Sequence, residues 1–178
     1  MIAIIEDADL VGKSTNAERL SADRGWPIVR IRWDLIGDPM VETTAMAKST
    51  TAMLEALDPD VVFDRSFLSW WAYGPVLGHE VDYMPNLAER LGRLRDVHVV
   101  LLTATESELR ARHERTPDAW FTIDQIVAAN ERVPSIETVL PDAIPRIQID
   151  TTHRSTDEVY ANIRAFLSAG ASGSAGGV

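Results

Sequence analysis

The sequence contains no cysteine among its 178 residues. This absence excludes disulfide bonds and any metal site built on thiolates. It also suits a reducing compartment, and we expect the protein to be cytoplasmic. No apolar run comes near the roughly 20 residues that a membrane-spanning helix requires. The apolar run at the N-terminus has no basic residue before it and meets an acid at Glu6, which is not typical of a signal peptide.

Basic residues are also scarce. Lysine and arginine together number 17, against 27 aspartates and glutamates, and the formal net charge is −10. Because no basic cluster is present, we do not expect the protein to hold a nucleic-acid backbone. The hydrophobic fraction of 46% and the charged fraction of 25% are ordinary for a globular protein, and the length fits one domain with a full core.

Strand-like and helix-like patterns alternate along the chain. The predicted strands cover residues 1–6, 27–33, 60–64, 97–104 and 145–150, and the predicted helices cover 12–25, 40–57, 106–115, 122–140 and 156–167. This alternation predicts an α/β fold, a single domain in which a five-stranded parallel sheet carries helices on both faces.

Local signals place several boundaries. Gly25 is a predicted helix C-cap, Pro134 predicts a bend, and Ser155 or Thr156 is a predicted N-cap followed by an acidic pair. Small residues dominate the end of the chain, so we expect residues 1–168 to form the domain and residues 169–178 to form a flexible tail.

The opening segment MIAIIEDADLVGKST ends as a phosphate-binding loop does. It fits the pattern G-x-x-x-x-G-K-[ST] except that Asp7 replaces the first glycine. Such a loop lies between a strand and a helix, whose N-terminal N–H groups attract phosphate. Lys13 would then reach the outer phosphates and Ser14 would offer its hydroxyl to Mg²⁺. The alternative is an ordinary strand followed by a capped helix.

A second polar group follows the third predicted strand. Asp64 can hold Mg²⁺ directly or through water, and Arg65 can form a fork on phosphate oxygens. The alternative is a helix N-cap with a surface arginine. The aromatic residues Trp70 and Tyr73 come next and are our candidates for binding a substrate base, although aromatic residues at helical spacing also build cores.

The segments EDADLVGKST and DRSFLSWWAYG together resemble the thymidylate kinase and deoxynucleoside kinase group of P-loop kinases, including small phage-type kinases. The closing IQIDTTHRSTDEV is similar to the last strand and helix of that group. The resemblance implies a kinase that uses ATP and Mg²⁺. The residues that fall on the frame of that group are Glu6, Asp9, Gly12, Lys13, Ser14 and Thr15, of which all but Glu6 would bind the nucleotide. Asp64 and Arg65 match the acid-arginine pair that this group carries after the third strand. The resemblance also implies that Ser14 and Asp64 bind the metal ion.

The resemblance assigns further roles. It places Asp34 as the base on the acceptor hydroxyl, with Asp38 as a rival, and Arg32 faces the same way by strand alternation. Residues 105–120 would be a lid. Its arginines are Arg110, Arg112 and Arg115, of which Arg112 would act in catalysis and the other two on the nucleotide. The alternative is a solvated helix in which glutamates pair with these arginines.

Two residues depart from the family pattern. Asp7 and Leu10 replace loop glycines, which threatens the tight turn and the close approach of phosphate to the backbone. The leading expectation is transfer of phosphate from ATP to a deoxynucleoside monophosphate. A nucleoside, a modified base in DNA or another small hydroxyl compound are alternative acceptors, and a nucleotide-binding module without turnover is an alternative of another class. The sequence leaves open whether the protein forms a homodimer.

Overall fold

The computed structural model describes residues 1–30, 43–56, 60–94 and 96–173. Five strands form one wholly parallel sheet in the order β2-β3-β1-β4-β5. The strands are β1 (Ile2–Asp7), β2 (Ile28–Arg30), β3 (Val61–Asp64), β4 (Val97–Thr103) and β5 (Arg146–Asp150). The predicted fold class is therefore confirmed.

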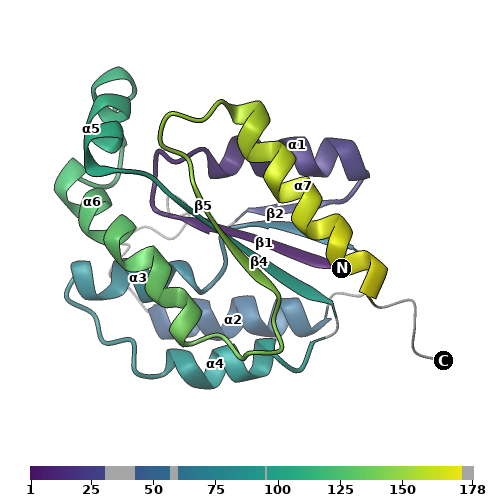
Figure 1. The fold of residues 1–178 in the computed structure, drawn as a ribbon. Coiled ribbons are helices and arrows are strands. Elements are labelled where there is room, and N and C mark those ends of the chain that lie inside the picture. The colour runs from purple at the N-terminus through teal and green to yellow at the C-terminus, as the bar shows by residue number, and fades with distance from the viewer. Residues whose placement is uncertain (31–42, 57–59, 95, 174–178) are drawn as a thin grey trace.

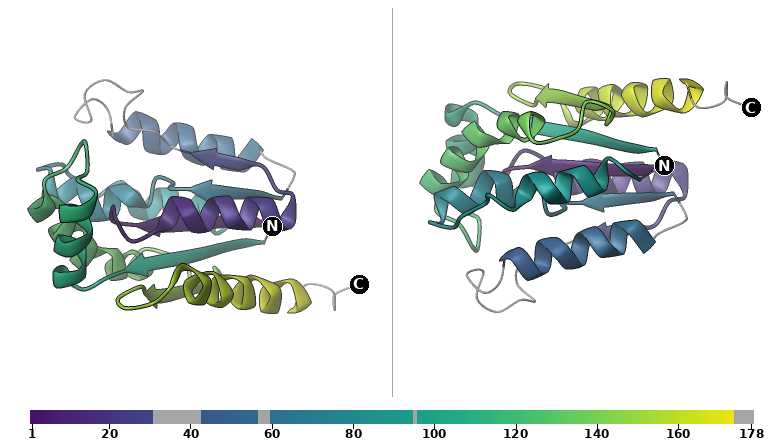
Figure 2. Two further views of the ribbon diagram at one scale, coloured as in Figure 1. Left: turned by 90° about the horizontal axis from the view of Figure 1, so that it is seen from above. Right: turned by 90° about the horizontal axis from the view of Figure 1, so that it is seen from below.

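Helices cover both faces of the sheet (Figure 1). They are α1 (Lys13–Arg24), α2 (Thr43–Ala56), α3 (Ser69–Val76), α4 (Met84–Leu91), α5 (Glu106–Arg115), α6 (Ile123–Arg132) and α7 (Thr156–Gly173), with a 3₁₀ helix at Val133–Thr138. Figures 1 and 2 show α1 and α7 on one face and α2, α3, α4 and α6 on the other, while α5 lies beyond the carboxyl ends of the strands. Within the part of the chain described, no helix is long and apolar enough to cross a bilayer.

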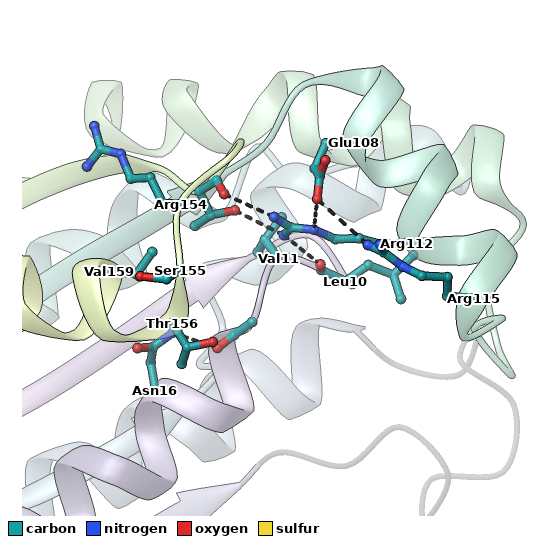
Figure 3. A pocket seen from close by; sticks show the side chains of 12 residues that line it. Leu10, Val11, Asn16, Glu108, Arg112, Arg115, Arg154, Ser155, Thr156 and Val159 are labelled. Carbon is teal, nitrogen blue, oxygen red and sulfur yellow. Dashed lines mark hydrogen bonds and ion pairs between the residues drawn. The ribbon is translucent and has the colours of Figure 1, made fainter.

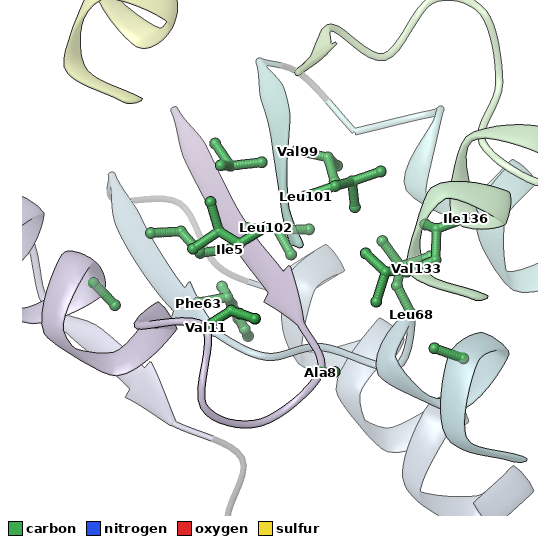
Figure 4. Packing of buried hydrophobic residues seen from close by; sticks show 14 of the residues in the cluster. Ile5, Ala8, Val11, Phe63, Leu68, Val99, Leu101, Leu102, Val133 and Ile136 are labelled. Atoms are coloured by element: carbon green, nitrogen blue, oxygen red, sulfur yellow. The ribbon is translucent and has the colours of Figure 1, made fainter. Parts of the chain in front are cut away.

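The central strands are apolar because they are covered on both faces. Every residue of β1, β3 and β4 is buried. Figure 4 shows side chains of these strands packed with residues that follow β3 and α6. The core thus fixes the central strands, and their polar ends are presented at one edge.

Most predicted boundaries are confirmed. Gly25 adopts the left-handed conformation after α1, with φ 67°. Ser155 is the N-cap of α7, because its N–H donates to Glu158 Oε2 at 2.8 Å and its Oγ accepts from the Glu158 N–H at 3.3 Å. Beyond α6 the chain continues as the 3₁₀ helix that contains Pro134. Helix α7 continues to Gly173, so the segment expected to be a flexible tail begins inside a helix.

Two helices, α3 and α4, lie where no element was predicted. Helix α3 contains Gly74 and Pro75 and has apolar residues on all sides, so its sequence has no helical periodicity. Helix α4 does carry such a signal, because its buried residues recur at helical spacing. They are Met84, Leu87, Ala88 and Leu91.

The connections diverge at the carboxyl ends of β1 and β3. These strands are neighbours, yet β1 leads into α1 on one face while β3 leads toward α3 on the other. Loops that diverge from adjacent strands in this way leave room for a ligand at the carboxyl edge of the sheet. The segments that carry Lys13 and Asp64 border this point.

Candidate functional site

The loop after β1 turns through two left-handed residues before α1 begins. Leu10 and Gly12 both have left-handed backbone conformations, with φ 71° and 94°. A non-glycine residue in that conformation costs about 1–2 kcal/mol, so Leu10 is strained where the family pattern has glycine. The turn that we expected to be at risk is thus formed, and Gly12 leads directly into α1.

Lys13 lies at the centre of the site. Its side chain is buried, and its Nζ lies 2.6 Å from Asp64 Oδ1 and 3.4 Å from Ser14 Oγ. The structure therefore brings together the three side chains that the sequence assigned to phosphate and metal. Thr15 follows in the first turn of α1 and is exposed.

Asp64 ends β3 and is held from two sides. Its Oδ2 accepts a hydrogen bond of 2.7 Å from Arg30 Nε, and Arg30 Nη2 also donates to Glu18 at 2.8 Å. Burial opposes ionisation of Asp64, but the charge of Lys13 and the hydrogen bonds outweigh it, so the pKa of Asp64 lies below its ordinary value. Sequence reasoning missed Arg30, although it ends the strand beside β3 and pairs in register with Asp64.

Asp7 ends β1 and is buried at the same place. Its Oδ1 lies 3.7 Å from Lys13 Nζ and 3.8 Å from Arg65 Nη2. This oxygen makes no hydrogen bond with any residue that the structure describes. Burial raises the pKa of Asp7 to about 7, although both cations act in the opposite direction. A carboxylate thus stands where the family pattern has a glycine with no side chain.

Arg65 and Tyr73 hold the middle of the loop through Asp9. Arg65 is buried with φ 74°, and its guanidinium donates to Asp9 Oδ1. The Tyr73 hydroxyl donates to Asp9 Oδ2 at 2.6 Å and accepts from the Asp9 N–H at 2.9 Å. The ring of Tyr73 stacks on Phe121, with centroids 4.6 Å apart. Trp70, the other aromatic candidate, is buried in the core with 2% of its surface exposed.

Glu6 ties the end of β1 to the start of α3. Its carboxylate accepts a hydrogen bond of 2.7 Å from the Ser66 N–H, and the hydroxyls of Ser66 and Ser69 also donate to it. Burial raises the pKa of Glu6 to about 6, although these hydrogen bonds and Arg65 act in the opposite direction. The family frame included Glu6, but the sequence did not reveal that its partners are two serines beyond β3.

A cavity of about 380 Å³ lies beside the loop (Figure 3). Its walls are the loop, α5 and the connection between β5 and α7. Its lining residues include Leu10, Gly12, Arg112, Arg115, Thr151 and Arg154. The first turn of α7 extends the wall that the connection forms, so segments that are distant in sequence line the space.

Arg112 joins these walls. It donates to the Leu10 carbonyl at 3.0 Å, to Thr151 Oγ1 at 3.1 Å and to the Thr151 carbonyl at 3.0 Å, and its Nε donates to Glu108 at 2.8 Å. Arg115 also lines the cavity and is 69% exposed. Arg110 is not a lining residue, since it pairs with Glu106 and Asp124 at 2.8 Å each. The three lid arginines thus have different surroundings.

Arg32, Asp34 and Asp38 lie outside the described residues. In the part of the chain that is described, no three His, Cys, Asp or Glu side chains gather as a metal site. Mg²⁺ does not require such a group, because it usually keeps several waters and binds one or two carboxylates plus substrate phosphates. Asp64, Ser14 and the unbonded oxygen of Asp7 fit that pattern of donors.

Comparisons with known proteins agree with this fold. No protein-family model and no curated protein matches the sequence. YorR from Bacillus subtilis, solved in complex with phosphorylated GDP, matches with a TM-score of 0.72 and 18% identity, over 94% of this chain and 96% of its own.

Two kinases match in the same way. Deoxyadenosine kinase from M. mycoides with bound dATP gives a TM-score of 0.69 and 16% identity, over 94% of this chain and 100% of its own. Thymidylate kinase from Candida albicans gives a TM-score of 0.59 and 15% identity, over 94% of this chain and 91% of its own. This chain therefore has the fold of nucleoside and nucleotide kinases.

Proposed function

We propose that this protein is a phosphotransferase that moves the γ-phosphoryl group of ATP to a deoxynucleoside monophosphate, with thymidylate as the leading acceptor. The observation that carries the proposal is the position of Lys13. Its amine lies at the start of α1, beside the carboxylate of Asp64, in a loop that also lines an open cavity. A strand, a turn with left-handed residues and a helix N-terminus together build a site for phosphate.

The donor would bind with its phosphates over the loop and its base in the cavity. Small-molecule sites have volumes of about 300–1,000 Å³, and this cavity of about 380 Å³ lies within that range. When bound, Mg²⁺ would neutralise charge on the phosphates, and Ser14 and Asp64 are the residues that would hold it. Arg115 and Arg154 add positive charge at the wall of the cavity.

The acceptor would bind beyond the carboxyl end of β3. We assign the role of base to Asp34 and the acceptor phosphate to Arg32 and Arg65, as the family resemblance implies. A single added phosphate is favoured over a long polyanion because the chain carries a net charge of −10. Arg65 donates to Asp9, so acceptor binding would have to share or replace that contact.

A panel of acceptors tests this proposal. The purified chain is incubated with ATP, MgCl₂ and deoxynucleosides, their monophosphates or a thymidine-containing oligonucleotide, and ADP release is measured. We expect at least one monophosphate to raise ADP release above the rate without acceptor. Phosphorylation of free nucleosides or of the oligonucleotide, with every monophosphate inert, would contradict the proposed acceptor.

A nucleotide-binding module without turnover is the second candidate, and Asp7 is the observation that favours it. A buried carboxylate near Lys13 competes with phosphate for the amine and repels it by Coulomb interaction. The same panel separates the two functions, since the module would bind ATP but release no ADP with any acceptor.

A further inference from the structure

We propose that Asp7 acts with Asp64 as a carboxylate pair that retains Lys13, so that the amine turns to nucleotide phosphate only when a divalent cation takes its place between the carboxylates. Asp7 is thus a positioning residue that makes nucleotide binding unusually dependent on the cation. This inference rests on the proposed nucleotide site, but it concerns a residue that the phosphate-loop pattern does not contain.

The distances show that one amine serves two acids. Lys13 Nζ lies 2.6 Å from Asp64 Oδ1 and 3.7 Å from Asp7 Oδ1, and all three side chains are buried. A glycine in place of Asp7 would leave only Asp64 at the amine. The arrangement is therefore a consequence of the substitution and not of the loop's backbone.

Two other cations lie nearby, and each of them is shared with a further acid. Arg30 donates to Asp64 Oδ2 and also pairs with Glu18. Arg65 donates to Asp9 and lies 3.8 Å from Asp7. If Lys13 moved to a phosphate, Asp7 and Asp64 would lose their shared amine while a polyanion arrived beside them.

Removing the amine is unfavourable for both carboxylates, since Asp64 would keep only Arg30 and Asp7 would keep only Arg65 at 3.8 Å. The Oδ1 atom of Asp7 is buried and makes no hydrogen bond among the described residues, so it is available to a ligand that carries positive charge. A divalent cation with oxygen donors from Asp7, Asp64 and Ser14 would restore the balance, and a bound ion is often the largest local charge in such a site.

Binding of a fluorescent ATP analogue to the full chain tests the inference. Affinity is measured in EDTA and across a series of MgCl₂ concentrations for the unmodified chain, Asp7→Gly and Asp7→Asn. Asp142→Asn, at an exposed aspartate before β5, is the matched control. Thermal unfolding of each variant reports on folding, and Asp7→Asn keeps the side-chain size if Asp7→Gly does not fold.

We expect the unmodified chain and Asp142→Asn to bind weakly in EDTA and much more tightly with Mg²⁺. Both Asp7 variants should bind about tenfold more tightly than the unmodified chain in EDTA. A factor of ten corresponds to about one pKa unit, which is the lower end of the shift that one opposite charge causes at close range. The increase in affinity that Mg²⁺ gives should therefore be smaller in both Asp7 variants than in the unmodified chain. Equal ratios of affinity with and without Mg²⁺ in all four proteins would overturn the inference.

The two proposals fail in different ways. Shrinkage of the Mg²⁺ effect in the Asp7 variants, without ADP release for any acceptor, supports the role of Asp7 and contradicts the kinase. If an acceptor is phosphorylated but the ratio of affinities with and without Mg²⁺ is the same in the Asp7 variants as in the unmodified chain, only the role of Asp7 is contradicted. Absence of analogue binding in every protein, with Mg²⁺ present, overturns both.

Discussion

At the scale of single residues, Lys13 is the side chain on which the proposed chemistry depends most. We predict that Lys13→Ala lowers phosphoryl transfer by about a hundredfold or more, because it removes the charge that would stabilise the transferring group. The fold should persist, since Asp64 keeps its hydrogen bond from Arg30. Transfer rates and far-ultraviolet circular dichroism check both expectations.

Lys48→Ala provides the matched control, because Lys48 is the other lysine of the sequence and is exposed on α2. Its transfer rate should equal that of the unmodified chain. A Lys13→Ala variant that retains the full rate would remove the assignment of this loop to phosphate.

The residue scale also shows where sequence reasoning ends. The meeting of Lys13 and Asp64 could be predicted, because the carboxyl ends of parallel strands share one edge. The burial of Arg65 could not be predicted, because its positive φ and its contact with Asp9 arise from tertiary packing. Burial of Trp70 was equally hidden, since an aromatic residue suits a core and a base pocket alike.

At the scale of elements, the side chain of Arg112 links α5 to the loop after β1. Arg112 bonds the Leu10 carbonyl and both oxygens of Thr151. We predict that Arg112→Lys raises the KM for ATP about tenfold with little change in kcat, because a lysine cannot reproduce a planar fork and the cavity walls would separate.

Arg90→Lys is the control for this change, because Arg90 makes a forked ion pair with Glu55 in helices remote from the cavity. Steady-state kinetics of the two variants give the comparison. An unchanged KM in Arg112→Lys would show that this attachment does not shape the donor site.

The contact of α7 with β4 gives a prediction on stability. Ala in place of Gly within a helix usually stabilises by about 1 kcal/mol. At Gly170, however, a Cβ would overlap the His98 ring, coming within 2.9 Å of its Cδ2 and Cε1. We therefore expect Gly170→Ala to lower the free energy of unfolding by about 1–3 kcal/mol, measured by urea denaturation.

His98→Ala supplies the internal check on that expectation. Removal of the ring opens space for the new methyl group, so the cost of Gly170→Ala should largely disappear in the His98→Ala background. A stabilised Gly170→Ala single variant would mean that helix propensity outweighs the contact.

The elements also differ in how well the sequence reveals them. Five strands and the helices α1 and α5 follow from apolar runs, the Gly25 cap and charge pattern, all of which are local signals. Helix α3 does not, because its apolar residues lie on all sides and leave no periodicity that identifies a helix.

At the scale of the whole molecule, net charge bears on which acceptors can approach. We predict that single-stranded DNA does not compete with a deoxynucleoside monophosphate for the enzyme, because a chain with a net charge of −10 repels a long polyanion. ADP release is measured at a fixed monophosphate concentration with and without excess oligonucleotide. Inhibition that weakens as salt is added would contradict the prediction and indicate a basic groove.

The stability of the whole fold should also depend on pH through Glu6, which joins the central strand to α3. Burial raises the pKa of Glu6 from 4.5 to about 6. Because the folded state holds this proton more tightly than the unfolded chain, the stabilising contribution is complete below pH 4.5 and is lost as pH rises through 6. A rise of that size corresponds to about 2 kcal/mol.

Glu6→Gln should remove this pH dependence, because the amide keeps the shape of the side chain and can still accept hydrogen bonds from Ser66 but carries no charge. Urea denaturation in EDTA at about pH 5 and about pH 7.5 gives the free energies of unfolding. We expect the unmodified chain and the exposed-site control Glu131→Gln to lose about 1 kcal/mol more than Glu6→Gln between these conditions, because part of the contribution is already lost at pH 5. Equal losses in all three proteins would show that Glu6 ionises in the folded state as freely as in the unfolded chain, and that the link between β1 and α3 does not depend on its proton.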